Sequence, residues 1–198
     1  MDISDLNSKQ IARAQVIYTA AVPFGADAVK AALMTAADES SFLLFANDGT
    51  TKRSDVAQKW RDLARTSLNY EHDAVAPRQP ASTPEGTWDT TADSIGHFQQ
   101  RPMYGYGTVA ELMDPAESTR IFIRGSHGGT GTTRRFLDSP ATMTLAQRCQ
   151  WTQGSEFPDG ANYAPMETVA DQLIQRFGPI TPPAPANWWP AWFTQGSF

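Results

Sequence analysis

An alanine-rich run over residues 26–42 constrains the fold of this chain more than any other segment. Its sequence, A-D-A-V-K-A-A-L-M-T-A-A-D-E-S-S-F, consists mainly of residues that favour helices. We predict a helix that opens at Asp27 and carries Glu39 in its last turn. Because alanine lets neighbouring elements approach from every side, we expect this helix at the centre of an α-rich domain.

Segments of helical periodicity before and after this run predict further helices. The first follows Ser4 or Asp5 as its cap and ends at Pro23 and Gly25, which disfavour continuation of a helix. The other predicted helices run from Ser54 to about Leu68, from Asp114-Pro115 onward, over residues 144–152 and over residues 163–177. Most of the chain is therefore predicted to be helical.

The middle of the sequence has a different composition. Residues 71–92 are rich in Pro, Thr and Ser and predict a loop, while residues 88–100 could hold two short strands. We therefore expect a mainly α (α+β) fold with a small β-rich lobe or hairpin. One domain is predicted over residues 1–178. Residues 179–198, rich in Pro and Trp, are interpreted as a linker or a docked tail.

Composition argues against several classes of function. The net charge is −5, whereas a nucleic-acid-binding protein needs a basic face. No apolar run approaches the roughly 20 residues of a membrane-spanning helix, and residues 1–5 lack the apolar stretch of a signal peptide. His72, His97 and His127 are scattered and Cys149 is alone, so we expect no metal and no cofactor.

Glu39 is the first candidate for chemistry. A carboxylate at a helix C-terminus faces the negative end of the helix dipole, and the apolar residues after it would remove water. Both effects raise a carboxyl pKa, which suits a general acid near neutral pH. The alternative is a solvated glutamate at a helix end, which is the commoner situation for this residue type.

Several short motifs follow Glu39 in a characteristic order. The main ones are Glu39-Ser40, the block D-S-I-G-H-F-Q-Q-R-P over residues 93–102, Ala146-Gln147 and Asn162-Tyr163; the minor ones are Tyr106-Gly107-Thr108, Asp114-Pro115 and Phe157-Pro158-Asp159. This order resembles the lysozyme-like superfamily, in particular the branch of soluble lytic transglycosylases and goose-type lysozymes found in actinobacteria and their phages. His97 replaces a usual aliphatic residue, and residues 48–85 resemble an insertion.

The resemblance implies an enzyme that cleaves bacterial peptidoglycan at the β-1,4 bond between N-acetylmuramic acid and N-acetylglucosamine. Glu39 would be the general acid and Asp93 the second carboxylate, with Asp89 in reserve. The substrate-binding residues would be Ser40, Gln99, Gln100, Tyr106 and Tyr163. Each has a structural alternative, such as a backbone hydrogen bond for Ser40 or a turn for Asp93.

Two questions stay open at the level of sequence. An Asp93 that holds a water would make the enzyme a hydrolase, whereas a site without it would give 1,6-anhydro products by transglycosylation. The resemblance also leaves open a phage endolysin or a tail-associated virion module with a weak or inactive site. For an endolysin we expect a monomer in the host cytoplasm before release to the wall, with a wall-binding region possible beyond residue 198.

Overall fold

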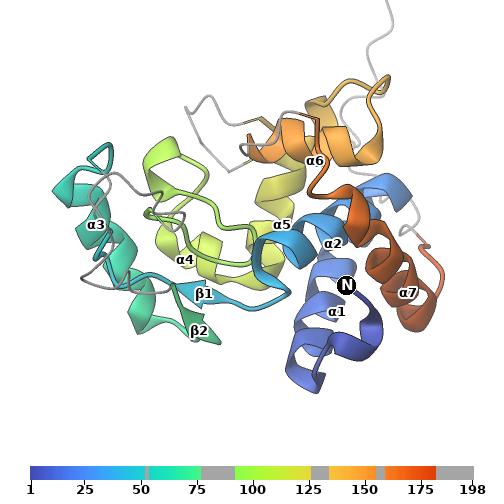
Figure 1. Ribbon diagram of the computed structural model, residues 1–198, viewed down its shortest axis with the longest axis horizontal. Helices are drawn as coiled ribbons and strands as arrows, with labels where there is room; N and C mark the ends of the chain where they lie inside the picture. The colour runs from blue at the N-terminus through green and yellow to red at the C-terminus, as the bar shows by residue number, and fades with distance from the viewer. Residues whose placement is uncertain (52–53, 77–91, 126–133, 155–158, 182–198) are drawn as a thin grey trace, which may run out of the picture.

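The computed structural model describes residues 1–51, 54–76, 92–125, 134–154 and 159–181. These residues form a mainly helical structure with seven α-helices and one sheet of two strands (Figure 1). None of their helices is long and apolar enough to cross a membrane. The predicted tail, apart from residues 179–181, lies outside the described residues.

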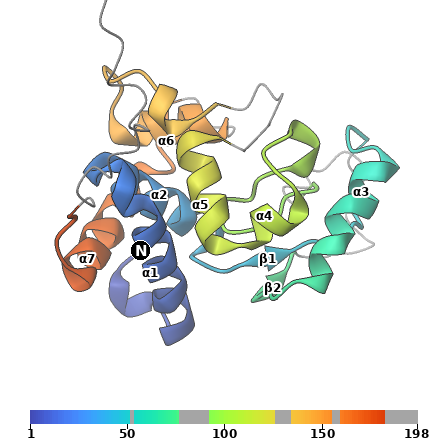
Figure 2. The same cartoon turned by 180° about the vertical axis from the view of Figure 1, so that it is seen from behind.

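Helix α2 (Ala26–Ser40) is the centre of the larger part of the molecule (Figures 1 and 2). It packs against α1 (Ser8–Ala21), α5 (Pro115–Arg124), α6 (Leu145–Gln153) and α7 (Glu167–Phe177). Apart from Ala26 at its first position, its alanines are almost completely buried in a core that also holds Phe98 and Phe122. The prediction of a central, closely packed helix is confirmed.

A smaller lobe lies to one side of this helical body. It contains α3 (Gln58–Arg65), α4 (Val109–Met113) and the parallel strands β1 (Phe45–Ala46) and β2 (Ala74–Val75). It has its own apolar core, formed by Leu44, Ala46, Ile95, Val109, Leu112, Met113 and Ile121. Helix α5 joins the two parts, because Ile121 belongs to the small core whereas Phe122 and Ile123 belong to the large one.

Short 3-10 helices connect these elements. They are η1 (Ile3–Asp5), η2 (Val22–Phe24), η3 (Thr66–Asn69), η4 (Pro102–Tyr104), η5 (Phe136–Asp138) and η6 (Ala164–Met166).

The small lobe is less β-rich than predicted. Part of the expected hairpin over residues 88–100 lies outside the described residues, and residues 92–100 form only isolated bridges, Ile95 with Gln100 and Phe45 with Gly96. Strand β2 instead falls in the segment predicted as a loop. Two of the predicted helix caps are also wrong: Asn7 caps α1, and Ala57 precedes α3 without a side-chain cap. The start of α5 after Asp114 is confirmed.

An ion-pair network attaches the small lobe to α1. Lys9 and Arg13 of α1 both pair with Asp73, whose side chain is 2% exposed, and Asp73 also accepts a hydrogen bond of 2.8 Å from the Leu44 backbone N–H. Burial alone would raise the pKa of Asp73, but these partners lower it below its usual value. The network therefore keeps Asp73 charged and ties the start of β2 to the helical body.

Candidate active site

Glu39 lies in the last turn of α2, where the chain turns sharply towards the small lobe. The two positions after the helix, Ser41 and Phe42, have φ angles of 50° and 62°, in the left-handed region. Their N–H groups donate to the carbonyls of Ala37 and Ala36, which closes the helix end. The Phe42 side chain is completely buried, and this burial offsets the strain of the turn.

The carboxyl of Glu39 is surrounded by neutral hydrogen-bond donors. The Tyr163 hydroxyl donates to Glu39 Oε1 over 2.7 Å, and the Gln153 side chain also bonds to the carboxyl. The pKa of Glu39 is raised to about 7, mainly because the carboxyl is buried. The charge of Asp38 also raises this pKa, whereas the two hydrogen bonds lower it by less than burial raises it. Near neutral pH this carboxyl is therefore protonated in a large fraction of the molecules.

A tight turn before η6 positions Tyr163. Gly160 has a φ of 75°, and a Cβ atom there would lie 2.5 Å from the carbonyl oxygen of Ala146. Only glycine fits so close to the start of α6. The turn also presents Asn162, whose side-chain amide donates to Asp38 over 2.6 Å. Two consecutive residues thus hold the two consecutive carboxyls of α2.

Gln153 and Tyr106 complete the surroundings of Glu39. Gln153 ends α6, and its amide also donates to the carbonyl of Phe98. The Tyr106 hydroxyl lies 3.5 Å from the Gln153 carbonyl oxygen. Burial raises the pKa of Tyr106, and the nearby charge of Glu39 raises it further. The structure therefore brings three predicted residues together, namely Glu39, Tyr106 and Tyr163.

Gln153, Asn162 and Asp38 also belong to this site, although the sequence motifs did not predict them as site residues. Asn162 and Asp38 adjoin motif residues, and that adjacency is a usable signal. Gln153 has no such signal, since its contact with Glu39 joins residues 114 positions apart along the chain.

The other predicted binding residues make mainly local contacts. The Ser40 hydroxyl is buried and donates to the carbonyl of Ala36 over 3.0 Å, the backbone role that we considered as its alternative. Gln99 has a φ of 46°, and its side-chain amide donates to the Gly96 carbonyl over 3.0 Å. Gln100 is 3% exposed, and its side-chain amide has no hydrogen-bond partner among the described residues.

Asp93 is held away from solvent. Its exposure is zero, one carboxylate oxygen is bound by Arg101 Nε, and the other accepts the Met103 N–H over 3.2 Å. The predicted catalytic role of Asp93 stays a prediction, but this geometry favours a structural one. Asp89, the reserve candidate, lies outside the described residues.

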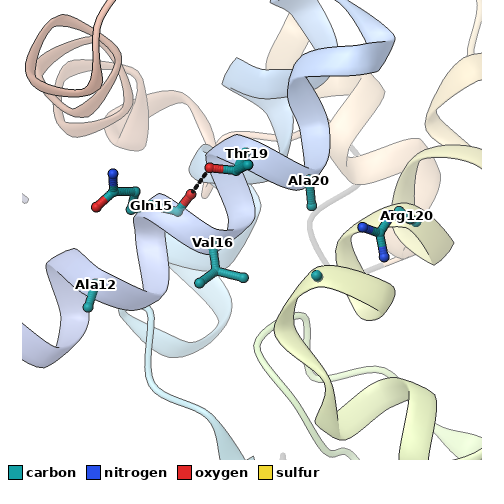
Figure 3. Close-up of a pocket in the computed structure, with 7 residues that line it drawn as sticks. Ala12, Gln15, Val16, Thr19, Ala20 and Arg120 are labelled. Atoms are coloured by element: carbon teal, nitrogen blue, oxygen red, sulfur yellow. Dashed lines mark hydrogen bonds between the residues drawn. The ribbon is translucent and has the colours of Figure 1, made fainter.

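A hollow elsewhere on the surface is not lined by any acidic residue of the described chain segments. It measures about 330 Å³ and lies between α1 and α5, lined by Ala12, Gln15, Val16, Thr19, Ala20, Ala116 and Arg120 (Figure 3). None of these residues is an acid, and Arg120 already pairs with Glu117 at 2.9 Å. This hollow therefore does not replace the surroundings of Glu39 as the candidate site.

Comparisons with known proteins add no family to this description. No protein-family model matches the chain, and no curated protein matches it either. No cluster of His, Cys, Asp or Glu in the part of the chain that the structure describes could hold a metal ion.

Proposed function

We propose that this protein cleaves bacterial peptidoglycan at the β-1,4 bond between N-acetylmuramic acid and N-acetylglucosamine, with Glu39 as general acid. The observation that carries the proposal is the setting of Glu39: a carboxyl with a pKa of about 7, held by Tyr163 at the end of the central helix. The resemblance to lysozyme-like proteins supplies the substrate class, and it alone supports a role as a phage endolysin.

Cleavage of a glycosidic bond needs a proton on the bridging oxygen, because a sugar alkoxide is a poor leaving group. A carboxyl of ordinary pKa is almost fully ionised at pH 7 and cannot supply that proton. Glu39 can, since burial keeps a large part of it protonated. The hydrogen bond from Tyr163 fixes the orientation of the carboxyl and would stabilise the carboxylate left after proton transfer.

For the second half of the reaction, the setting of Asp93 favours a transglycosylase over a hydrolase. A hydrolase needs a base to activate water, and Asp93 is buried with both oxygens occupied by Arg101 and Met103. In the alternative route, the 6-hydroxyl oxygen of muramic acid attacks C1 of the same ring. Its proton passes to the Glu39 carboxylate, which restores the acid and leaves a 1,6-anhydro product.

The test uses purified peptidoglycan and three proteins. We expect Glu39→Gln to reduce the rate of wall solubilisation by about 10²–10⁴-fold, because the amide cannot donate the proton. Glu167→Gln is the matched control, since Glu167 lies in the first turn of α7 and pairs with Lys30 at 3.2 Å. Wild-type activity in a folded Glu39→Gln protein would refute the proposal.

Mass spectrometry of the released fragments separates the two routes. Products that end in 1,6-anhydromuramic acid indicate transglycosylation, whereas reducing ends indicate hydrolysis. Reducing ends would require a base outside the contacts described above and would return Asp93 or Asp89 to the mechanism.

A further inference from the structure

Arg134 is an exposed cation held in a defined position near the candidate site. Its guanidinium carbon lies 5.3 Å from the centre of the Trp151 ring, and its Nη1 donates to the Trp151 carbonyl oxygen over 3.4 Å. Trp151 belongs to the last turn of α6 and is itself half-buried. Stacking on a fixed ring orders an arginine side chain that would otherwise be mobile.

The same end of α6 reaches Glu39. Gln153, two residues after Trp151, bonds to the Glu39 carboxyl, and its carbonyl oxygen lies 3.5 Å from the Tyr106 hydroxyl. After burial, the two largest influences on the pKa of Tyr106 are the charge of Glu39, which raises it, and the charge of Arg134, which lowers it. The contacts of Arg134 with Trp151 and of Tyr106 with Gln153 thus place both side chains at the same end of α6.

None of the ion pairs among the described residues involves Arg134. Its neighbour Arg135 differs, because Arg135 Nε pairs with Asp138 at 3.2 Å. A guanidinium offers five N–H donors in a planar fork, and a carboxylate can accept two of them at once. An exposed, oriented fork beside a candidate acid is suited to an anionic group of the substrate.

We propose that Arg134, stacked on Trp151, forms a subsite for a carboxylate carried by the glycan substrate. The inference rests on the proposed function and adds the charge of the substrate to it. Peptidoglycan has two sources of such a group: the lactyl carboxylate of muramic acid, when no peptide is attached, and the carboxylates of the stem peptide. Strands of N-acetylglucosamine alone have neither.

Binding to the inactive Glu39→Gln protein tests the subsite without any turnover. Calorimetry would compare a peptide-free tetrasaccharide of alternating N-acetylglucosamine and N-acetylmuramic acid with the neutral chitotetraose. We expect Arg134→Gln to weaken binding of the charged sugar about tenfold or more, and to leave binding of chitotetraose unchanged. Arg134→Lys should lie between, because lysine keeps the charge but loses the fork.

Arg135→Gln is the matched control, since it removes the same charge one residue away. An equal loss for both sugars in Arg134→Gln would overturn the inference and make Arg134 a structural residue. A tetrasaccharide that carries stem peptides identifies the source. A loss confined to the peptide-free charged sugar assigns the lactyl carboxylate, whereas a loss with the peptide-bearing sugar assigns the peptide. No loss with either charged sugar would overturn the inference.

Failure of the inference can be distinguished from failure of the proposed function. A protein that binds both charged sugars, with and without stem peptides, regardless of Arg134, and still cleaves peptidoglycan through Glu39, refutes the subsite alone. A protein that binds neither sugar and releases no fragments refutes both.

Discussion

Carboxyl groups of the two parts of the molecule are buried in opposite ways. In the helical body, Glu39 is surrounded by the neutral donors Tyr163 and Gln153, and burial raises its pKa to about 7. In the small lobe, the side chains of Asp93 and Asp73 are 0% and 2% exposed and face arginine or lysine side chains. Neutral donors leave the Glu39 carboxyl able to hold a proton, whereas the ion pairs of Asp93 and Asp73 make these carboxylates structural ties.

This contrast predicts that the two kinds of carboxyl respond differently to the same change from acid to amide. Replacement of the Glu39 carboxyl in the helical body should affect activity and the dependence of stability on pH. Replacement in the small lobe should affect the fold. Three substitutions test this division, and the largest effect on stability is expected for Asp93→Asn.

Asp93→Asn should lower the free energy of unfolding by about 3–5 kcal/mol, because it leaves the charge of Arg101 buried without its main partner. The lower end is favoured, since Asp55 keeps a second ion pair with Arg101 at 3.7 Å. Urea unfolding at pH 7 measures the change. Asp138→Asn, which removes an exposed ion pair with Arg135, should cost less than about 1 kcal/mol. A stable but inactive Asp93→Asn protein would instead restore Asp93 as the catalytic base.

Glu39→Gln should change how stability depends on pH. The pKa of Glu39 is about 7 in the folded protein and near 4.5 when unfolded, so the folded state holds the proton more tightly. The protonated Glu39 therefore contributes on the order of 3 kcal/mol to the free energy of unfolding. This contribution is present in full below pH 4.5 and is lost as the pH rises through 7.

Denaturation of both proteins at pH 4.5 and pH 8 measures this effect. The wild type should lose more stability than Glu39→Gln across that range, whereas Glu167→Gln should follow the wild type. Parallel curves for the wild type and Glu39→Gln would show that burial does not raise the pKa of Glu39.

Much of the helical body could be predicted from the sequence, because its signals are local. Alanine content and periodicity indicate α2, and Asp114 before a proline marks the start of α5. The sequence also indicated Glu39 as a candidate, since its position at a helix end before apolar residues is visible without a structure.

The small lobe and the side chains around Glu39 were harder to predict, because their contacts are not local. Strand β2 has two residues and is defined by its pairing with β1, about 29 positions earlier in the chain. The position of Gln153 beside Glu39 depends on the packing of α6 against α2. The pairing of Asp93 with Arg101 spans only eight residues, but no sequence pattern distinguishes it from two separate charges.

The smallest expected effect concerns the Tyr163 hydroxyl, whose hydrogen bond partly offsets the rise in the pKa of Glu39 that burial causes. The Tyr163 hydroxyl favours the charged form of Glu39 through a hydrogen bond of 2.7 Å and so holds its pKa down. Tyr163→Phe removes only this hydroxyl from a completely buried ring. The pKa of Glu39 should then rise by about one unit, equivalent to about 1.4 kcal/mol.

The alkaline limb of the pH–rate profile for peptidoglycan cleavage reports this shift. Because the protonated form of Glu39 is the active one, the limb should move to higher pH in Tyr163→Phe. Tyr18→Phe is the matched control, since the Tyr18 hydroxyl donates to the Gly178 carbonyl instead, and its limb should stay in place. A Tyr163→Phe limb that stays in place or moves to lower pH would mean that a group other than Glu39 supplies the proton, and the contrast between the two kinds of buried carboxyl would then lose its functional meaning.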